Sequence, residues 1–170
     1  VTRDALYNLS GDGVRSCGNW GGVPGDRVGQ HAEEHRFPYG PVVIIAPFNF
    51  PLEIPALQLA GALSMGNKVL IKGASTVDVV IEQFIRLLLS CGMPKNDVAL
   101  IHCSGLTMED IIRQTHPAMT QFTGSSKVAQ RLLFLTRGKI KIEDSGFNWK
   151  ILGPDCPLQN NQLLDYVAWQ

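Results

Sequence analysis

Residues 40–51 have the sequence GPVVIIAPFNFP, and this stretch decides the fold of the chain. Its first part, residues 42–46, is apolar and β-branched, and no polar residue interrupts it. A run of this kind is typical of a strand that is buried on both faces, as in parallel sheets. Pro47 and Pro51 then bracket a short turn, because each proline fixes φ and lacks a backbone donor. We therefore expect a buried parallel strand that ends in a rigid loop.

Asn49 has the one hydrogen-bonding side chain in that turn. In open parallel sheets, ligands bind beyond the carboxyl ends of the strands. An amide in that place can donate a hydrogen bond to a developing oxyanion. The alternative is a turn asparagine that bonds its own backbone, and spacing alone favours that alternative.

Composition limits the class of protein. The 170 residues are enough for one domain, with 45% apolar and 18% charged residues. Lys+Arg and Asp+Glu are both 15, so no charge steers the chain toward nucleic acid or a membrane surface. The four cysteines form no C-x-x-C pair, which favours a reducing compartment. The chain opens without Met and ends in mid-pattern, so we expect a piece of a longer polypeptide.

Strands and helices alternate from residue 41 onward, after a glycine-rich arm over 1–40 that begins with a helix end and continues as short hairpins. This alternation predicts an α/β fold with a Rossmann-like parallel sheet flanked by helices. The expected strands are 42–46, 68–72, 98–103, 119–123, 139–143 near the sheet edge, and 149–152. The expected helices are 51–64, one capped by Ser75 or Thr76 and stopped by Gly92, 107–115, one from Ser125 or Ser126 to Arg137, and 161–170.

Three further signals fall on the same edge of the expected sheet. The sequence FTGSS, residues 122–126, ends a strand and opens a helix, where N–H groups and hydroxyls can hold a pyrophosphate. A simple helix cap is the more frequent meaning of such a serine. Lys72 ends a strand and could bind a ribose or a phosphate, or be a solvated strand end. Glu143 could be a general base, or a surface acid paired with a neighbouring lysine.

Two other patterns carry less weight. Residues 31–35, HAEEH, match the H-x-x-E-H spacing of zinc hydrolases, but Gly29 and Pro38 leave no room for the long helix that such a site needs, so we expect no metal. No cysteine has a convincing nucleophile setting, and we expect Cys91 and Cys103 to be small buried apolar residues.

Taken together, these stretches resemble the aldehyde dehydrogenase superfamily. Residues 46–51, APFNFP, are similar to its P-W-N-F-P motif with Phe48 in the tryptophan place, and residues 122–125 match its F-T-G-S element. Lys72 stands at the place of its cofactor lysine, and Glu143 at the glutamate of its E-L-G-G motif. Residues 48–55, 122–126 and 141–155 resemble the plant-type Δ1-pyrroline-5-carboxylate dehydrogenases within it.

The resemblance implies a role for each matching position. Asn49 would donate to the oxyanion of the thiohemiacetal, and Glu143 would activate the water that hydrolyses the thioester. The resemblance also implies which residues contact NAD. Lys72 would bind the adenosine ribose, Gly124 and Ser125 the pyrophosphate, and Val128 would pack near the adenine. Ala46, Pro47 and Phe48 would line the nicotinamide half.

The resemblance also implies a function for the whole protein: NAD-dependent oxidation of glutamate γ-semialdehyde, in equilibrium with Δ1-pyrroline-5-carboxylate, to glutamate in proline catabolism, by a mitochondrial homo-oligomer. Residues 41–170 would be the NAD-binding domain of an incomplete aldehyde dehydrogenase fold. The family's cysteine nucleophile lies a few dozen residues beyond Glu143, so we expect the 170 residues alone to be inactive. Many members of the family have, at the position of Ser75, a glutamate that binds the ribose. With serine there, the sequence does not decide between NAD and NADP. The alternative is a catalytically silent nucleotide-binding or assembly module, with a zinc hydrolase third.

Overall fold

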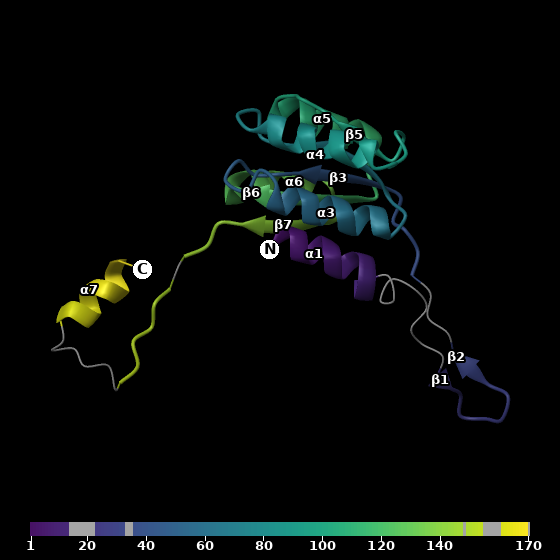
Figure 1. The fold of residues 1–170 in the computed structure, drawn as a ribbon, viewed down its shortest axis with the longest axis horizontal. Coiled ribbons are helices and arrows are strands. Elements are labelled where there is room, and N and C mark those ends of the chain that lie inside the picture. Colours follow the sequence, from purple (N-terminus) through teal and green to yellow (C-terminus); the bar gives the residue numbers. More distant parts are fainter. Residues whose placement is uncertain (14–22, 33–35, 148, 155–160, 170) are drawn as a thin grey trace.

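Five parallel strands form the central sheet of the computed structural model, which describes residues 1–13, 23–32, 36–147, 149–154 and 161–169 (Figure 1). The strand order is β5-β4-β3-β6-β7, so β3, the strand of the stretch that decides the fold, lies at the centre. The strands are β3 (Pro41–Ile45), β4 (Lys68–Lys72), β5 (Val98–Leu100), β6 (Met119–Gly124) and β7 (Ile140–Asp144). The expected α/β fold with a parallel sheet is thus confirmed.

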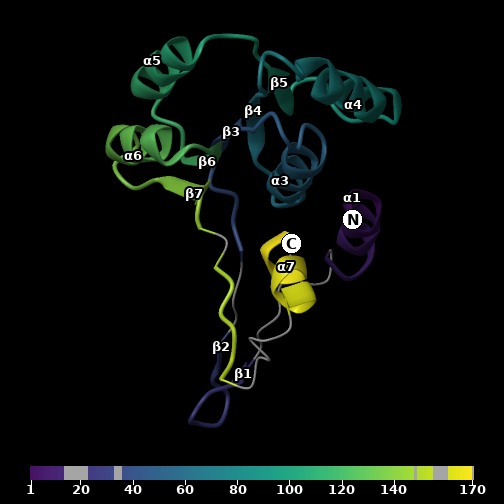
Figure 2. The ribbon, with the colours of Figure 1, turned by 90° about the vertical axis from the view of Figure 1, so that its left-hand side faces the viewer.

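Helices cover both faces of the sheet (Figure 2). Helices α3 (Glu53–Ser64) and α4 (Asp78–Ser90) lie on one face, and α5 (Gly105–Thr115) and α6 (Ser126–Leu135) lie on the other. The chain winds outward from β3 to β5 and then returns to place β6 on the other side of β3. The carboxyl ends of β3 and β6 therefore flank a topological switch point, which is where open α/β sheets bind ligands.

Alternation along β3 divides the core between the two faces. Val42 and Ile44 belong to a cluster with α3 and α4, whereas Val43 belongs to a second cluster with α5 and α6. All three side chains are at most 3% exposed. The strand is therefore buried on both faces, which explains why it contains no polar residue.

Two expected elements are wrong, and both have a physical reason. The segment Trp149–Leu152 is no strand, and its side chains are exposed. The segment pairs with no strand among the described residues, so its N–H and C=O groups complete no ladder. Neither Ser75 nor Thr76 caps α4: the N-cap is Val77, because a turn closed by Val77 N–H to Ala74 O (2.8 Å) precedes the helix.

The expected N-terminal arm agrees with the part of it that the structure describes. A helix, α1 (Thr2–Asn8), continues into a π-helical turn (Leu9–Gly13), and β1 (Val23–Pro24) pairs antiparallel with β2 (His31–Ala32). The last element, α7 (Asn161–Trp169), confirms the expected C-terminal helix and buries none of its side chains. Within the described ranges, no helix is long and apolar enough to cross a membrane.

Candidate functional site

The turn after β3 lies beyond the carboxyl end of that strand, as expected, and the strand order places it at the switch point. Ala46 is buried and its N–H donates to Lys72 O (3.0 Å), which fixes the start of the turn to the end of β4. Pro47 is half-buried, while Phe48 and Asn49 are exposed. The Asn49 amide therefore faces solvent beyond the carboxyl end of a central strand, where a bound molecule can reach it.

Lys72 and Val128 lie in one cavity, although 56 positions separate them. The cavity has a volume of about 360 Å³ and lies at the carboxyl edge of the sheet, on the face that α5 and α6 cover. Its apolar walls are Ile45, Leu106, Met108, Phe122, Val128 and Leu132, and its polar groups come from Lys72, Ser104, Glu109 and Arg131. Apolar walls with a few polar groups are typical of small-molecule pockets of this size.

The amino group of Lys72, which lines this cavity, is held by one hydrogen bond. Its Nζ donates to Gly73 O at 2.9 Å, a half-buried bond to the next residue in the chain. An ammonium group has three hydrogens, so this bond leaves two of them for a ligand.

The turn from β6 into α6 confirms the expected strand end and helix start. Gly124 ends β6 and Ser125 is the N-cap of α6, with its side chain unbonded to the helix. A Cβ on Gly124 would lie 2.7 Å from the Phe122 ring, so only glycine fits there. The first N–H groups of a helix have no carbonyl partner within it, and they carry partial positive charge. The turn can therefore receive an anionic group.

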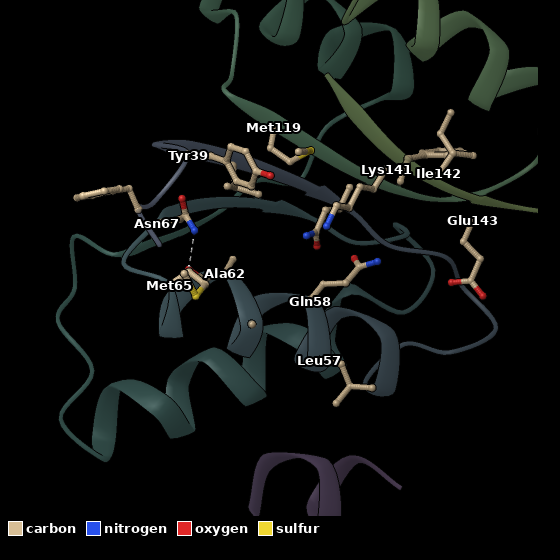
Figure 3. Close-up of a pocket in the computed structure, with 15 residues that line it drawn as sticks. Tyr39, Leu57, Gln58, Ala62, Met65, Asn67, Met119, Lys141, Ile142 and Glu143 are labelled. Atoms are coloured by element: carbon tan, nitrogen blue, oxygen red, sulfur yellow. Dashed lines mark hydrogen bonds between the residues drawn. The ribbon is translucent and has the colours of Figure 1, made fainter. Parts of the chain in front are cut away.

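Glu143 lies elsewhere: it lines a second cavity, of about 560 Å³, on the α3 face of the sheet (Figure 3). Figure 3 shows Glu143 at one end of this cavity, Tyr39 and Asn67 at the other, and Gln58 between them. Glu143 is exposed, and its strand partner is Thr123. The structure therefore brings Lys72 and Val128 together, and separates them from Glu143 by the thickness of the sheet.

The model of the aldehyde dehydrogenase family matches residues 14–161. The chain belongs to the aldehyde dehydrogenase family. As an aldehyde dehydrogenase chain, it is 52% identical to the mitochondrial Δ1-pyrroline-5-carboxylate dehydrogenase 12A1 of Arabidopsis thaliana, over 100% of this chain and 30% of that protein. It is 37% identical to 1-pyrroline-5-carboxylate dehydrogenase 2 of Halalkalibacterium halodurans, over 62% of this chain and 21% of that protein.

Solved structures agree on the fold. Proline utilization A of Bradyrhizobium japonicum has a TM-score of 0.75 and 25% identity, and the match covers 84% of this chain and 15% of that one. An aldehyde dehydrogenase from Brucella melitensis has a TM-score of 0.75 at 19% identity, covering 85% of this chain and 31% of that one. The aldehyde dehydrogenase chain thus spans about a third or less of the length of the relatives it matches. Members of the family use NAD or NADP.

The sequence did not predict that residues of α5 form one wall of the 360 Å³ cavity. The expected helix 107–115 begins two residues earlier, at Gly105, because Ser104 caps it by accepting from Thr107 N–H at 3.1 Å. The sequence did contain a signal for this helix start: Ser104 follows a strand and can cap a helix, as Ser125 does after β6. Arg131 was also missed: it pairs with Glu109 at 2.7 Å and links α6 to α5 at the rim.

The structure tests the expected burial of Cys91 and Cys103, and it describes only two residues of the zinc pattern. Cys91 is exposed at the C-cap of α4, because the helix ends there, so the expectation of a buried side chain is wrong. Cys103 is half-buried and packs against the core cluster under α5 and α6. The zinc pattern of residues 31–35 includes Glu33, Glu34 and His35, which lie outside the described residues.

Proposed function

We propose that this aldehyde dehydrogenase chain holds NAD, with the adenosine half in the 360 Å³ cavity under α5 and α6. The observation that carries the proposal is that Lys72 and Val128, implied for the two parts of adenosine by independent stretches of sequence, line the same cavity. The residues fit the group chemically. Apolar walls suit a purine base, and the free hydrogens of the Lys72 ammonium suit the hydroxyls of a ribose.

The pyrophosphate would lie at the turn between β6 and α6. Gly124 has no Cβ to keep a phosphate away, and Ser125 offers its hydroxyl together with the N-terminus of α6. The nicotinamide half would then extend over the switch point along Ala46, Pro47 and Phe48. When bound there, NAD supplies the acceptor for a hydride.

Asn49 and Glu143 would serve the substrate rather than the dinucleotide. The exposed amide of Asn49 would donate to the oxyanion that forms on the aldehyde carbon, and Glu143 would take a proton from the attacking water. We infer that the nucleophilic thiolate comes from outside the described residues, since Cys91 is at the C-cap of α4, away from the carboxyl edge, and Cys103 packs into the core. The 170 residues alone would then bind NAD without oxidising an aldehyde.

The substrate we propose is glutamate γ-semialdehyde, which is in equilibrium with Δ1-pyrroline-5-carboxylate, and the product is glutamate in proline catabolism. The support is the function in the names of the plant and bacterial relatives. The name of the Arabidopsis relative likewise supports a mitochondrial location. From the resemblance of the sequence motifs to the family, we also propose residues 1–40 as an arm, 41–170 as the NAD-binding domain, and a homo-oligomer as the parent assembly.

Calorimetric titration of the chain with NAD tests the cavity. Lys72→Met should weaken NAD binding roughly 10- to 100-fold, the usual loss when a hydrogen bond to a charged group is removed. Lys95→Met is the matched control, because Lys95 is an exposed lysine in the turn before β5, at the opposite edge of the sheet. Equal weakening by both variants, or by neither, would contradict the assignment.

A further inference from the structure

A buried acid and a histidine lie next to the proposed nucleotide cavity without lining it. Asp78, in the first turn of α4, has a side chain only 9% exposed, and its Oδ2 lies 2.8 Å from Nδ1 of His102. His102 follows β5 and is half-exposed, at 53%. A carboxylate can only accept, so Nδ1–H of the imidazole donates this bond. The pair joins the start of α4 to the turn after β5.

The first end of the pair leads to Lys72. The carboxylate of Asp78 lies directly on Gly73, where an added Cβ would be 2.0 Å from Oδ1. Gly73 in turn accepts the bond from Lys72 Nζ through its carbonyl, at 2.9 Å. The position of the carboxylate therefore sets the position of Gly73, and through Gly73 the direction of the lysine ammonium.

His102, the other member of the pair, lies close in sequence to the wall of the cavity that Ser104 lines. His102 is two residues before Ser104, the N-cap of α5 and a lining residue of the cavity. Moving His102 would move the start of α5 relative to β4. Among the described residues, Oδ1 of Asp78 is buried and has no hydrogen-bond partner. A carboxylate with one oxygen unpartnered depends on its remaining bond, so the loss of His102 would leave it wholly unpaired in the interior.

We propose that Asp78 and His102 are positioning residues for the nucleotide: their bond fixes the distance between the Lys72 and Ser104 walls of the cavity. The inference rests on the proposed function, because the cavity is taken to hold the adenosine half of NAD. Neither residue touches the dinucleotide in this account, and both act through their neighbours.

The first readout needs no nucleotide. Hydrogen–deuterium exchange of the free chain should show faster exchange over 73–77 and 101–105 in His102→Leu than in wild type, with the rest of the sheet unchanged. His102→Gln keeps a side-chain donor and should restore slow exchange. Unchanged exchange in His102→Leu would overturn the inference and leave the proposed function intact.

The second readout is NAD affinity by calorimetry. His102→Leu and Asp78→Ala should each weaken binding about fivefold to tenfold, whereas His102→Gln should stay within about twofold of wild type. Arg86→Leu is the matched control, since it removes an exposed ion pair with Glu82 on the same helix. If His102→Leu fails to fold, Asp78→Ala answers the same question, because it removes the acceptor of the bond and also the buried charge. Altered exchange together with wild-type NAD affinity in these variants would overturn the inference.

A double-mutant cycle separates positioning from general stability. If the pair acts by placing the Lys72 ammonium, His102→Leu should cost less in a Lys72→Met background than in wild type. If the double variant weakens NAD binding by the product of the two single effects, the pair acts elsewhere, and the inference would be overturned. If Lys72→Met alone binds NAD as wild type does, the proposed function fails, and this inference fails with it.

Discussion

Asn49→Ala in the full-length enzyme is expected to lower kcat by about 10²–10³, the loss found for one oxyanion donor. The structure gives the reason: the amide is exposed beyond the carboxyl end of the central strand, and buried Ala46 fixes the start of its turn to β4. Because the oxyanion forms only during the reaction, the affinity for NAD should stay unchanged. The measurement is steady-state kinetics with glutamate γ-semialdehyde, beside an NAD titration.

A turn asparagine that is not at the switch point gives the control for this variant. Asn96 is exposed in the turn before β5, at the amino edge of the sheet, so Asn96→Ala should leave kcat unchanged. A kcat for Asn49→Ala equal to that of wild type would show that the amide serves only its own turn.

Glu143→Gln is expected to separate the two half-reactions of the full-length enzyme. Hydride transfer does not need the base, so a rapid burst of NADH should persist, while steady-state turnover falls by about 10²–10⁴. Stopped-flow absorbance of NADH measures both phases. Asp97→Asn is the control: Asp97 lies in the turn before β5, at the amino edge of the sheet, so this variant should keep the wild-type turnover. Loss of the burst, or turnover at the wild-type rate, would contradict the role of Glu143 as the base.

The sequence predicts the fold well where one physical rule dominates. The uninterrupted apolar run of β3 indicates burial on both faces, and both core clusters include residues from that strand. Lys72 could be placed at a strand end because the next strand also has a clear apolar core. Which residues share a cavity could not be predicted, since that depends on how closely α5 and α6 pack over the sheet. The position of Glu143 on the α3 face was also missed, because it depends on the register of β7 against β6.

Predictions from local sequence were wrong where contacts with distant residues or neighbouring turns decide the structure. Residues 149–152 have strand propensity, but a strand also needs a partner for its N–H and C=O groups, and this segment pairs with no strand among the described residues. Ser75 and Thr76 are good caps by type, yet a turn from Ala74 to Val77 delays α4. The bond between Asp78 and His102 joins residues 24 positions apart, so no local pattern could show it.

The central claim is that the cavity under α5 and α6 takes the adenosine half of NAD. Hydrogen–deuterium exchange of the chain, with and without saturating NAD, tests it most directly because it reports on every segment at once. We predict slower exchange over 72–76, 104–108 and 124–129 when NAD is present, and no change in α1 or in the cavity residues of α3. Protection confined to the α3 cavity, or an unchanged exchange pattern at saturating NAD, would contradict the account.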